Sequence, residues 1–205
     1  MSWKNIKFSL VFVLLVFVPV LSAAQTSDSI DAASSVDVSE PSTEGWLVIT
    51  GSIINFYYLP DANLRKLEAR LRTRSVPMSQ GFRMLLSNRY LTTEEKIAAR
   101  LQIILLRVKN ILGMDPLNMH IKMQVFKTRH DLDWAYEQMF HSPTNFKSFY
   151  MHHFESIFSN EQDFIDSVIA HELGHAVIDH YFAVAPPSQM AELMATYVDA
   201  HLDEY

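Results

Sequence analysis

Five consecutive residues carry the strongest chemical signal in this sequence: His171-Glu172-Leu173-Gly174-His175. On a helix that turns about 100° per residue, the two imidazoles lie about 40° apart and one turn apart in height, so both can bind one metal ion. Glu172 lies about 60° from His175, beside the metal, where it can take a proton from water. The spacing therefore predicts a Zn2+ centre with His171 and His175 as ligands and Glu172 as the general base.

A catalytic zinc needs a third protein ligand and one open position. Ile178 and Tyr181 stand where a longer form of the motif would place a glycine and a third histidine, so the third ligand is expected further along the chain. Glu192 fits that role. The chain climbs about six residues beyond His175, turns, and descends about five, which at about 1.5 Å per residue returns it to the height of the metal.

Two carboxylates are candidates for accepting the second N–H group of a ligand histidine. Asp199 follows Glu192 by seven residues and lies about 20° from its direction on the helix; Asp179 lies one turn beyond His175. A solvated surface carboxylate is the alternative for Asp199. His180, about 140° from His175, is expected to point away from the metal. The other single histidines, expected on the surface, are His120, His130, His141 and His201, and the methionines expected in the core are Met190 and Met194.

The elements that must position these groups follow from periodicity and from capping residues. Strands are predicted at 53–59 and 120–127. A first helix is predicted after Asp61, which is expected to cap it, and further helices are predicted at 92–113, 131–140, 161–181 and 188–202. Thr92 and Glu95 form a capping box, and Ser159 or Asn160 is expected to cap the helix with the two histidines. Residues 149–150 and 156–158 form a strand pair or one bent strand. With two helices at the end of the chain, this order predicts an α+β fold.

The composition is that of one ordinary globular domain: 205 residues, 49% hydrophobic, and no cysteine. The absence of cysteine excludes thiolate nucleophiles, disulfides and iron-sulfur clusters. Lys4 and Lys7 precede an apolar run of about 14 residues that ends in Ser22-Ala23-Ala24. We therefore expect a signal peptide over 1–24, and an exported protein, periplasmic or extracellular, without a stable membrane anchor. A retained anchor is the alternative, but a spanning helix needs roughly 20 residues.

Charge is distributed unevenly along the mature chain. Residues 25–45 are rich in Ser and Thr with five acidic groups and no basic one, which predicts a flexible segment before a single domain at 46–205. Residues 46–129 hold 14 basic and 5 acidic groups, and residues 130–205 hold one lysine and 13 acidic groups. A basic half can indicate nucleic acid. No nucleic-acid motif accompanies it, so we favour two packed halves of opposite charge and predict no nucleic-acid partner.

A family resemblance adds to these predictions. The histidine motif, followed by Ala191-Glu192-Leu193-Met194-Ala195-Thr196-Tyr197-Val198-Asp199, resembles the gluzincin zinc metallopeptidases, especially small exported bacterial proteins of the peptidase MA-like type. It covers roughly the last 60 residues. It implies a zincin-like fold, in which a small N-terminal sheet with helices precedes the metal helix and a Glu-bearing helix.

The same resemblance implies the roles of individual residues. His171, His175 and Glu192 would be the ligands and Glu172 the base, and 149–158 would be the edge strand on which a peptide pairs. One departure concerns the oxyanion. Gluzincins usually stabilise it with a Tyr or His that follows the Glu-bearing helix, and only six residues follow Asp199. Substitutes from the strand region are Tyr150, His152 and His153.

Two functions follow from these patterns. The first is an exported zinc-dependent peptidase with peptide or protein substrates. Because the acidic half builds the metal site, basic or neutral peptides are expected to be preferred, unless its carboxylates pair with the basic half. The second is an exported, zinc-stabilised binding or assembly protein whose peptidase-like site does not turn over.

Overall fold

The computed structural model describes residues 39–72 and 91–204. The predicted signal peptide and residues 25–38 of the predicted flexible segment lie outside the described residues. Along the chain the elements are β1 (Leu47–Thr50), β2 (Ile54–Tyr58), α1 (Leu64–Arg70), α3 (Thr93–Leu112), β3 (Ile121–Phe126), α4 (Arg129–Phe140), β4 (Ser148–Met151), the 3-10 turn η1 (His152–Phe154), β5 (Ser156–Asn160), α5 (Asp166–Tyr181) and α6 (Ser188–His201). Within the described ranges, no helix is both long enough and apolar enough to cross a bilayer.

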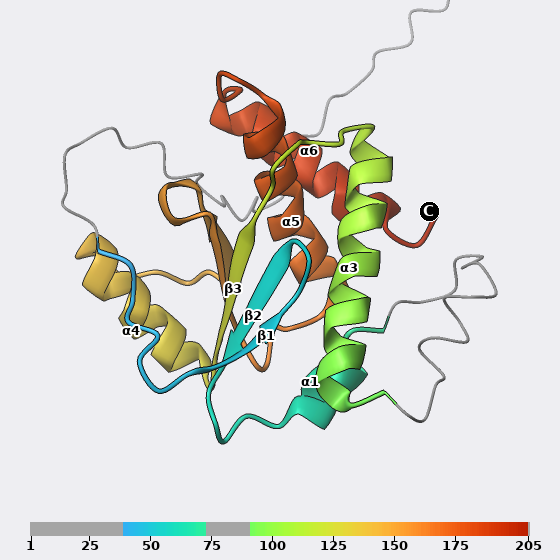
Figure 1. Cartoon of the computed structure of the whole chain (residues 1–205). Coiled ribbons are helices and arrows are strands. Elements are labelled where there is room, and N and C mark those ends of the chain that lie inside the picture. The colour runs from blue at the N-terminus through green and yellow to red at the C-terminus, as the bar shows by residue number, and fades with distance from the viewer. Residues whose placement is uncertain (1–38, 73–90, 205) are drawn as a thin grey trace, which may run out of the picture.

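A five-stranded mixed sheet in the order β1-β2-β3-β5-β4 forms the centre of the protein (Figure 1). The central strands β2, β3 and β5 are parallel, and the two edge strands, β1 and β4, are antiparallel to their neighbours. Helix α4 lies on one side of the sheet, and α3, α5 and α6 lie on the other. The fold is therefore α+β, as the sequence predicts. Residues 148–160 form a strand pair and not a single bent strand. Of these two strands only β4 lies at the edge of the sheet, because β5 lies between β3 and β4.

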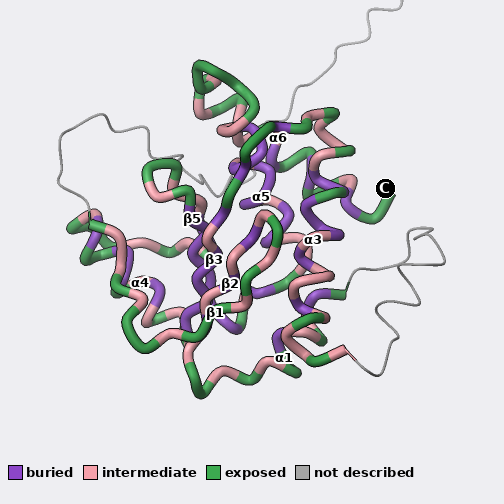
Figure 2. The backbone as a smooth tube through the Cα atoms, viewed as in Figure 1, coloured by how far each residue is buried: buried purple, intermediate pink, exposed green. Residues whose placement is uncertain are grey.

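Each face of the sheet has its own apolar core, because side chains alternate between the two faces. The larger core joins one face to α3 and α5, and includes Phe56, Met123 and Ile157. The smaller core joins the other face to α4, where the rings of Phe149 and Phe158 stack with centroids 4.9 Å apart. Figure 2 shows that buried residues are concentrated in the sheet and on the inner sides of the helices. Helix α5 is therefore supported by the larger core.

The capping signals of α3 are confirmed. The Thr92 side chain accepts from the Glu95 N–H, and the Glu95 carboxylate accepts from the Thr92 N–H at 2.7 Å. Gly113 ends the helix in the left-handed region, at φ 64°. These caps depend only on neighbours in the sequence, so the local pattern predicts them.

Two other caps were assigned to the wrong residue by the pattern. Asn63, not Asp61, caps α1 by accepting from the Lys66 N–H, while the Asp61 carboxylate lies 3.4 Å from Lys127 Nζ. Asn160 does not cap the histidine-bearing helix, which begins at Asp166. Its backbone continues β5, and its register partner is Phe126 in β3. Parallel pairing with β3 therefore extends the strand through the residues expected to start the helix.

The predicted flexible segment is structured at its C-terminal end. The Glu40 carboxylate accepts from Gln124 at 3.2 Å and Ser156 at 3.0 Å, and lies 2.7 Å from Lys122 Nζ. These three partners belong to β3 and β5. One carboxylate of the segment before Trp46 is therefore bound to the sheet, while the domain boundary at Trp46 stays a prediction.

Contacts between the basic and acidic halves support their packing against each other. Lys127 Nζ lies 3.4 Å from a Glu161 oxygen, and Arg129 Nη1 lies 3.8 Å from Asp163. Buried Arg107 lies in the field of two carboxylates from the acidic half, although burial is the main influence on its pKa and lowers it. Part of the acidic charge is thus matched inside the domain.

Candidate metal centre

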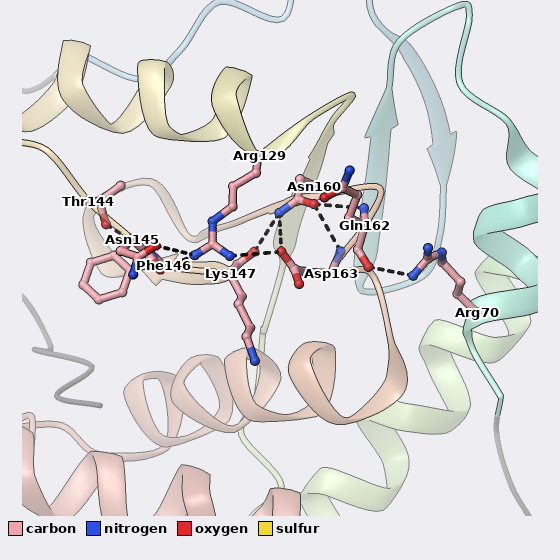
Figure 3. Close-up of polar contacts among 9 residues, drawn as sticks. All are labelled: Arg70, Arg129, Thr144, Asn145, Phe146, Lys147, Asn160, Gln162 and Asp163. Carbon is pink, nitrogen blue, oxygen red and sulfur yellow. Dashed lines mark hydrogen bonds and ion pairs between the residues drawn. The ribbon is translucent and has the colours of Figure 1, made fainter. Parts of the chain in front are cut away.

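A turn held by Asn160 positions the start of helix α5. The Asn160 Oδ1 atom accepts from the backbone N–H groups of Gln162 and Asp163, and its Nδ2 donates to the carbonyl of Lys147 at 3.1 Å (Figure 3). Arg70 also donates to the Gln162 carbonyl at 2.6 Å. These bonds connect α1, the chain before β4 and the β5–α5 loop, so they define where α5 leaves the sheet.

The three predicted ligands converge in the structure. His171 Nε2 and His175 Nε2 are 3.2 Å apart, and the Glu192 oxygens lie 3.5 Å from the first and 3.3 Å from the second. One donor atom from each residue lies within 4.8 Å of the others. All three residues are half-buried, so the cluster is reachable from solvent. This is a group of side chains that could hold a metal ion.

The environment of His171 favours its charged form when no ion is bound. Burial alone would lower the pKa of His171. The hydrogen bond with Glu192 and the charges of nearby carboxylates, including Glu172 and Asp199, outweigh burial and raise the pKa. A cation at the same place would face the same negative groups.

Glu172 is buried beside the cluster and is not part of it, as the helical geometry predicts. Burial raises the pKa of Glu172, while His175, His171 and a hydrogen bond from the Tyr150 backbone act in the opposite direction. A carboxyl group with a raised pKa that sits next to positive charge is suited to exchanging a proton.

Close packing of two helices brings Glu192 to the histidines. A Cβ atom on Gly174 would lie 3.4 Å from Ala195 Cα and 3.5 Å from Ala195 Cβ. Small residues on both helices therefore let α6 lie directly against α5, one turn from Glu192. The expectation that Met190 lies in the core is wrong, because its side chain is 52% exposed.

The two carboxylates that were candidates for supporting a ligand histidine have other surroundings in the structure, and for Asp199 these match the alternative of a surface carboxylate. Asp199 is exposed, and in the described part of the chain it acts on His171 through its charge without a direct hydrogen bond. Asp179 accepts from Tyr150 and is bound to His152, two of the proposed oxyanion residues. His153 packs against Phe154 with ring centroids 5.1 Å apart.

The remaining histidines take no part in the cluster. His180 Nδ1 lies 2.9 Å from the Ala176 carbonyl oxygen of its own helix, in agreement with its expected direction. His201 stacks on Tyr197 with centroids 3.9 Å apart. The sequence patterns missed the contact of Tyr150 with Glu172, and no local signal could have revealed it, because the two residues lie on different elements.

The comparisons with known proteins leave the chain without a family assignment. No family model, no curated protein and no solved structure matches it.

Proposed function

We propose that this chain is an exported zinc-dependent peptidase of zincin-like fold, with Glu172 as its general base. The observation that carries the proposal is the convergence of two imidazole nitrogens and one carboxylate beside a buried, unligated carboxyl group. Export rests on the sequence of residues 1–24 alone.

The donor distances suit zinc. With bonds of about 2.05 Å and a tetrahedral angle, two ligand atoms of one zinc ion are about 3.3 Å apart. The two histidine nitrogens are 3.2 Å apart, Glu192 Oε1 lies 3.5 Å from His171 Nε2, and Glu192 Oε2 lies 3.3 Å from His175 Nε2, so each pair of residues reaches about this separation through one of the carboxylate oxygens. Two histidine nitrogens and one carboxylate oxygen form a typical donor set for a catalytic zinc, which leaves a fourth position for water or substrate.

A zinc ion bound there would supply Lewis-acid polarisation of a peptide carbonyl and activation of water. Glu172 would accept a proton from the water that attacks the carbonyl carbon and deliver a proton to the leaving nitrogen as the C–N bond breaks. The oxygen of the water molecule would thus become part of the new carboxyl group, and a proton would go to the new amine. Strand β4 supports the proposal, because it is the sheet edge next to α5 and can pair with an extended peptide.

A binding or assembly protein that uses the same ion for stability is the second candidate. The observation that favours it is the engagement of Tyr150 and His152 with Asp179, which occupies two groups expected to stabilise an oxyanion.

Incubation of the purified protein with a mixed peptide library, with and without a chelator, separates the two functions. The peptidase proposal expects cleavage that the chelator abolishes and that added zinc restores. Stoichiometric zinc with no cleavage of any library member would favour the binding protein.

A further inference from the structure

One oxygen of Asp179 holds two residues from the edge of the sheet. Tyr150 Oη donates to Asp179 Oδ2 at 2.7 Å, and His152 Nδ1 lies 2.6 Å from the same oxygen. The Asp179 side chain is 16% exposed and that of His152 is 80% exposed. Burial, and next the Asp179 charge, raise the pKa of the Tyr150 phenol far above its usual range, so the hydroxyl remains a donor.

Tyr150 also contacts α5 at a second point. Its backbone forms a hydrogen bond with Glu172, which lowers the pKa of that carboxyl group. Glu172 and Asp179 are seven residues apart on one helix, about 10 Å along the axis and only about 20° apart in direction. A single residue of β4 therefore spans about two turns of α5, between which His175 lies.

These contacts matter because β4 is short and paired on one side. It has four residues, and β5 is its only partner strand in the described part of the chain. Hydrogen bonds to β5 hold it within the sheet, but they do not define its separation from α5. The bonds to Asp179 and Glu172 act across that gap.

We propose that Asp179 is a positioning residue: it fixes β4 against the metal-binding helix and so sets how an extended peptide pairs with β4. The inference rests on the proposed peptidase function, because it assumes that a peptide binds along β4 next to the metal. It assigns Asp179 no contact with the reacting atoms.

Three substitutions isolate this role. Asp179→Ala removes both bonds to the edge, and Tyr150→Phe removes the hydroxyl while it keeps the ring and the backbone bond to Glu172. His152→Ala removes the other partner. His130→Ala is the control, because His130 is exposed on α4, on the other side of the sheet, and takes no part in the proposed site.

A peptide hydroxamate measures main-chain pairing without hydrolysis. The probe is a dansyl-labelled tri-alanine hydroxamate, compared with the same compound carrying N-methyl groups on its backbone amides. In zinc-loaded wild-type protein, each methylated amide that pairs with β4 should weaken binding about fivefold. In Asp179→Ala this ratio should fall toward one, and in Tyr150→Phe it should fall part of the way. His130→Ala should keep the wild-type ratio.

Controls separate positioning from general damage and from the proposed function. Zinc content should stay the same in all variants, and the affinity for acetohydroxamate, which has no peptide part, should stay the same in Asp179→Ala and His130→Ala. A wild-type ratio in both Asp179→Ala and Tyr150→Phe, or no effect of N-methylation on the wild-type protein, would overturn the inference. A wild-type protein that shows the expected ratios but cleaves no peptide would remove the peptidase activity and leave the role of Asp179 intact.

Discussion

Gly174 of α5 and Ala195 of α6 approach so closely that a Cβ on Gly174 would lie 3.4 Å from Ala195 Cα. That distance is at the short end of ordinary contact, so Gly174→Ala should fold, keep zinc and gain helix propensity. Gly174→Val adds two methyl groups that the packed interface cannot accept. We expect it to cost about 1–3 kcal/mol of stability and to displace Glu192.

Thermal unfolding and competition with a zinc chelator measure both effects in the two Gly174 variants. Unchanged zinc affinity in a folded Gly174→Val protein would show that the close approach does not position Glu192.

Removal of both histidines tests the metal centre itself. A His171→Ala and His175→Ala double variant should contain no stoichiometric zinc, because only the Glu192 oxygen remains of the three donors. Metal analysis of the purified protein gives the answer. His180→Ala is the control, since His180 lies on the same helix and is bonded to the Ala176 carbonyl. Equal zinc in the double variant and the control would contradict the proposed centre.

Substitution at Glu172 and at Glu192 should separate chemistry from binding. Glu172 lies beside the cluster, so Glu172→Gln should retain zinc and the fold and reduce kcat on a confirmed peptide substrate by about 10²–10⁴-fold. Glu192→Gln should weaken zinc binding itself. Zinc titrations and peptide assays on both variants measure this. A Glu172→Gln protein as active as wild type would rule out this mechanism.

Removal of the Asp199 charge should have a modest effect on the affinity for zinc. Loss of a group that hydrogen-bonds a ligand histidine typically reduces metal affinity about 10–100-fold. Asp199 acts on His171 through charge without a direct bond, so Asp199→Asn should reduce zinc affinity less than about tenfold. Chelator competition at two salt concentrations checks this. A larger, salt-independent loss would mean that Asp199 bonds the ring once zinc is bound.

The preference for basic or neutral peptides stays a prediction and is expected to be small. Glu161 lies 3.4 Å from Lys127 and Asp163 lies 3.8 Å from Arg129, and these ion pairs neutralise part of the acidic charge near the metal centre. Matched lysine- and glutamate-containing peptides should differ in kcat/KM at low salt, and the difference should shrink at 0.5 M salt as screening increases. A preference that does not depend on salt would assign the acidic groups to internal pairing alone.

Sequence reasoning succeeded where the cause is local. The Thr92 and Glu95 cap, the left-handed Gly113, and the placement of His171 and His175 on one face of a helix each depend on residues within one or two turns. Convergence of Glu192 was also predictable, because helix rise and turn length restrict where the next helix returns.

It failed where distant residues decide the outcome. Asn160 extends a strand because Phe126, from another part of the chain, pairs with it. The sequence did not predict that Glu40 binds the sheet, because its partners Lys122 and Ser156 lie 82 and 116 residues away in sequence. Asp179 serves the sheet edge and not a ligand histidine, which depends on the path of β4. No periodicity or capping rule contains that information.

The side chains of the candidate centre come from one continuous part of the chain, which runs from Tyr150 in β4 through η1, β5 and α5 to Glu192 in α6. Contacts between neighbouring segments close short loops, which costs less chain entropy and favours rapid formation during folding. The central strands β2 and β3, by contrast, pair across more than 60 residues. We therefore expect amide protons of α5 and α6 to become protected together in a hydrogen-exchange pulse experiment, as one cooperative unit.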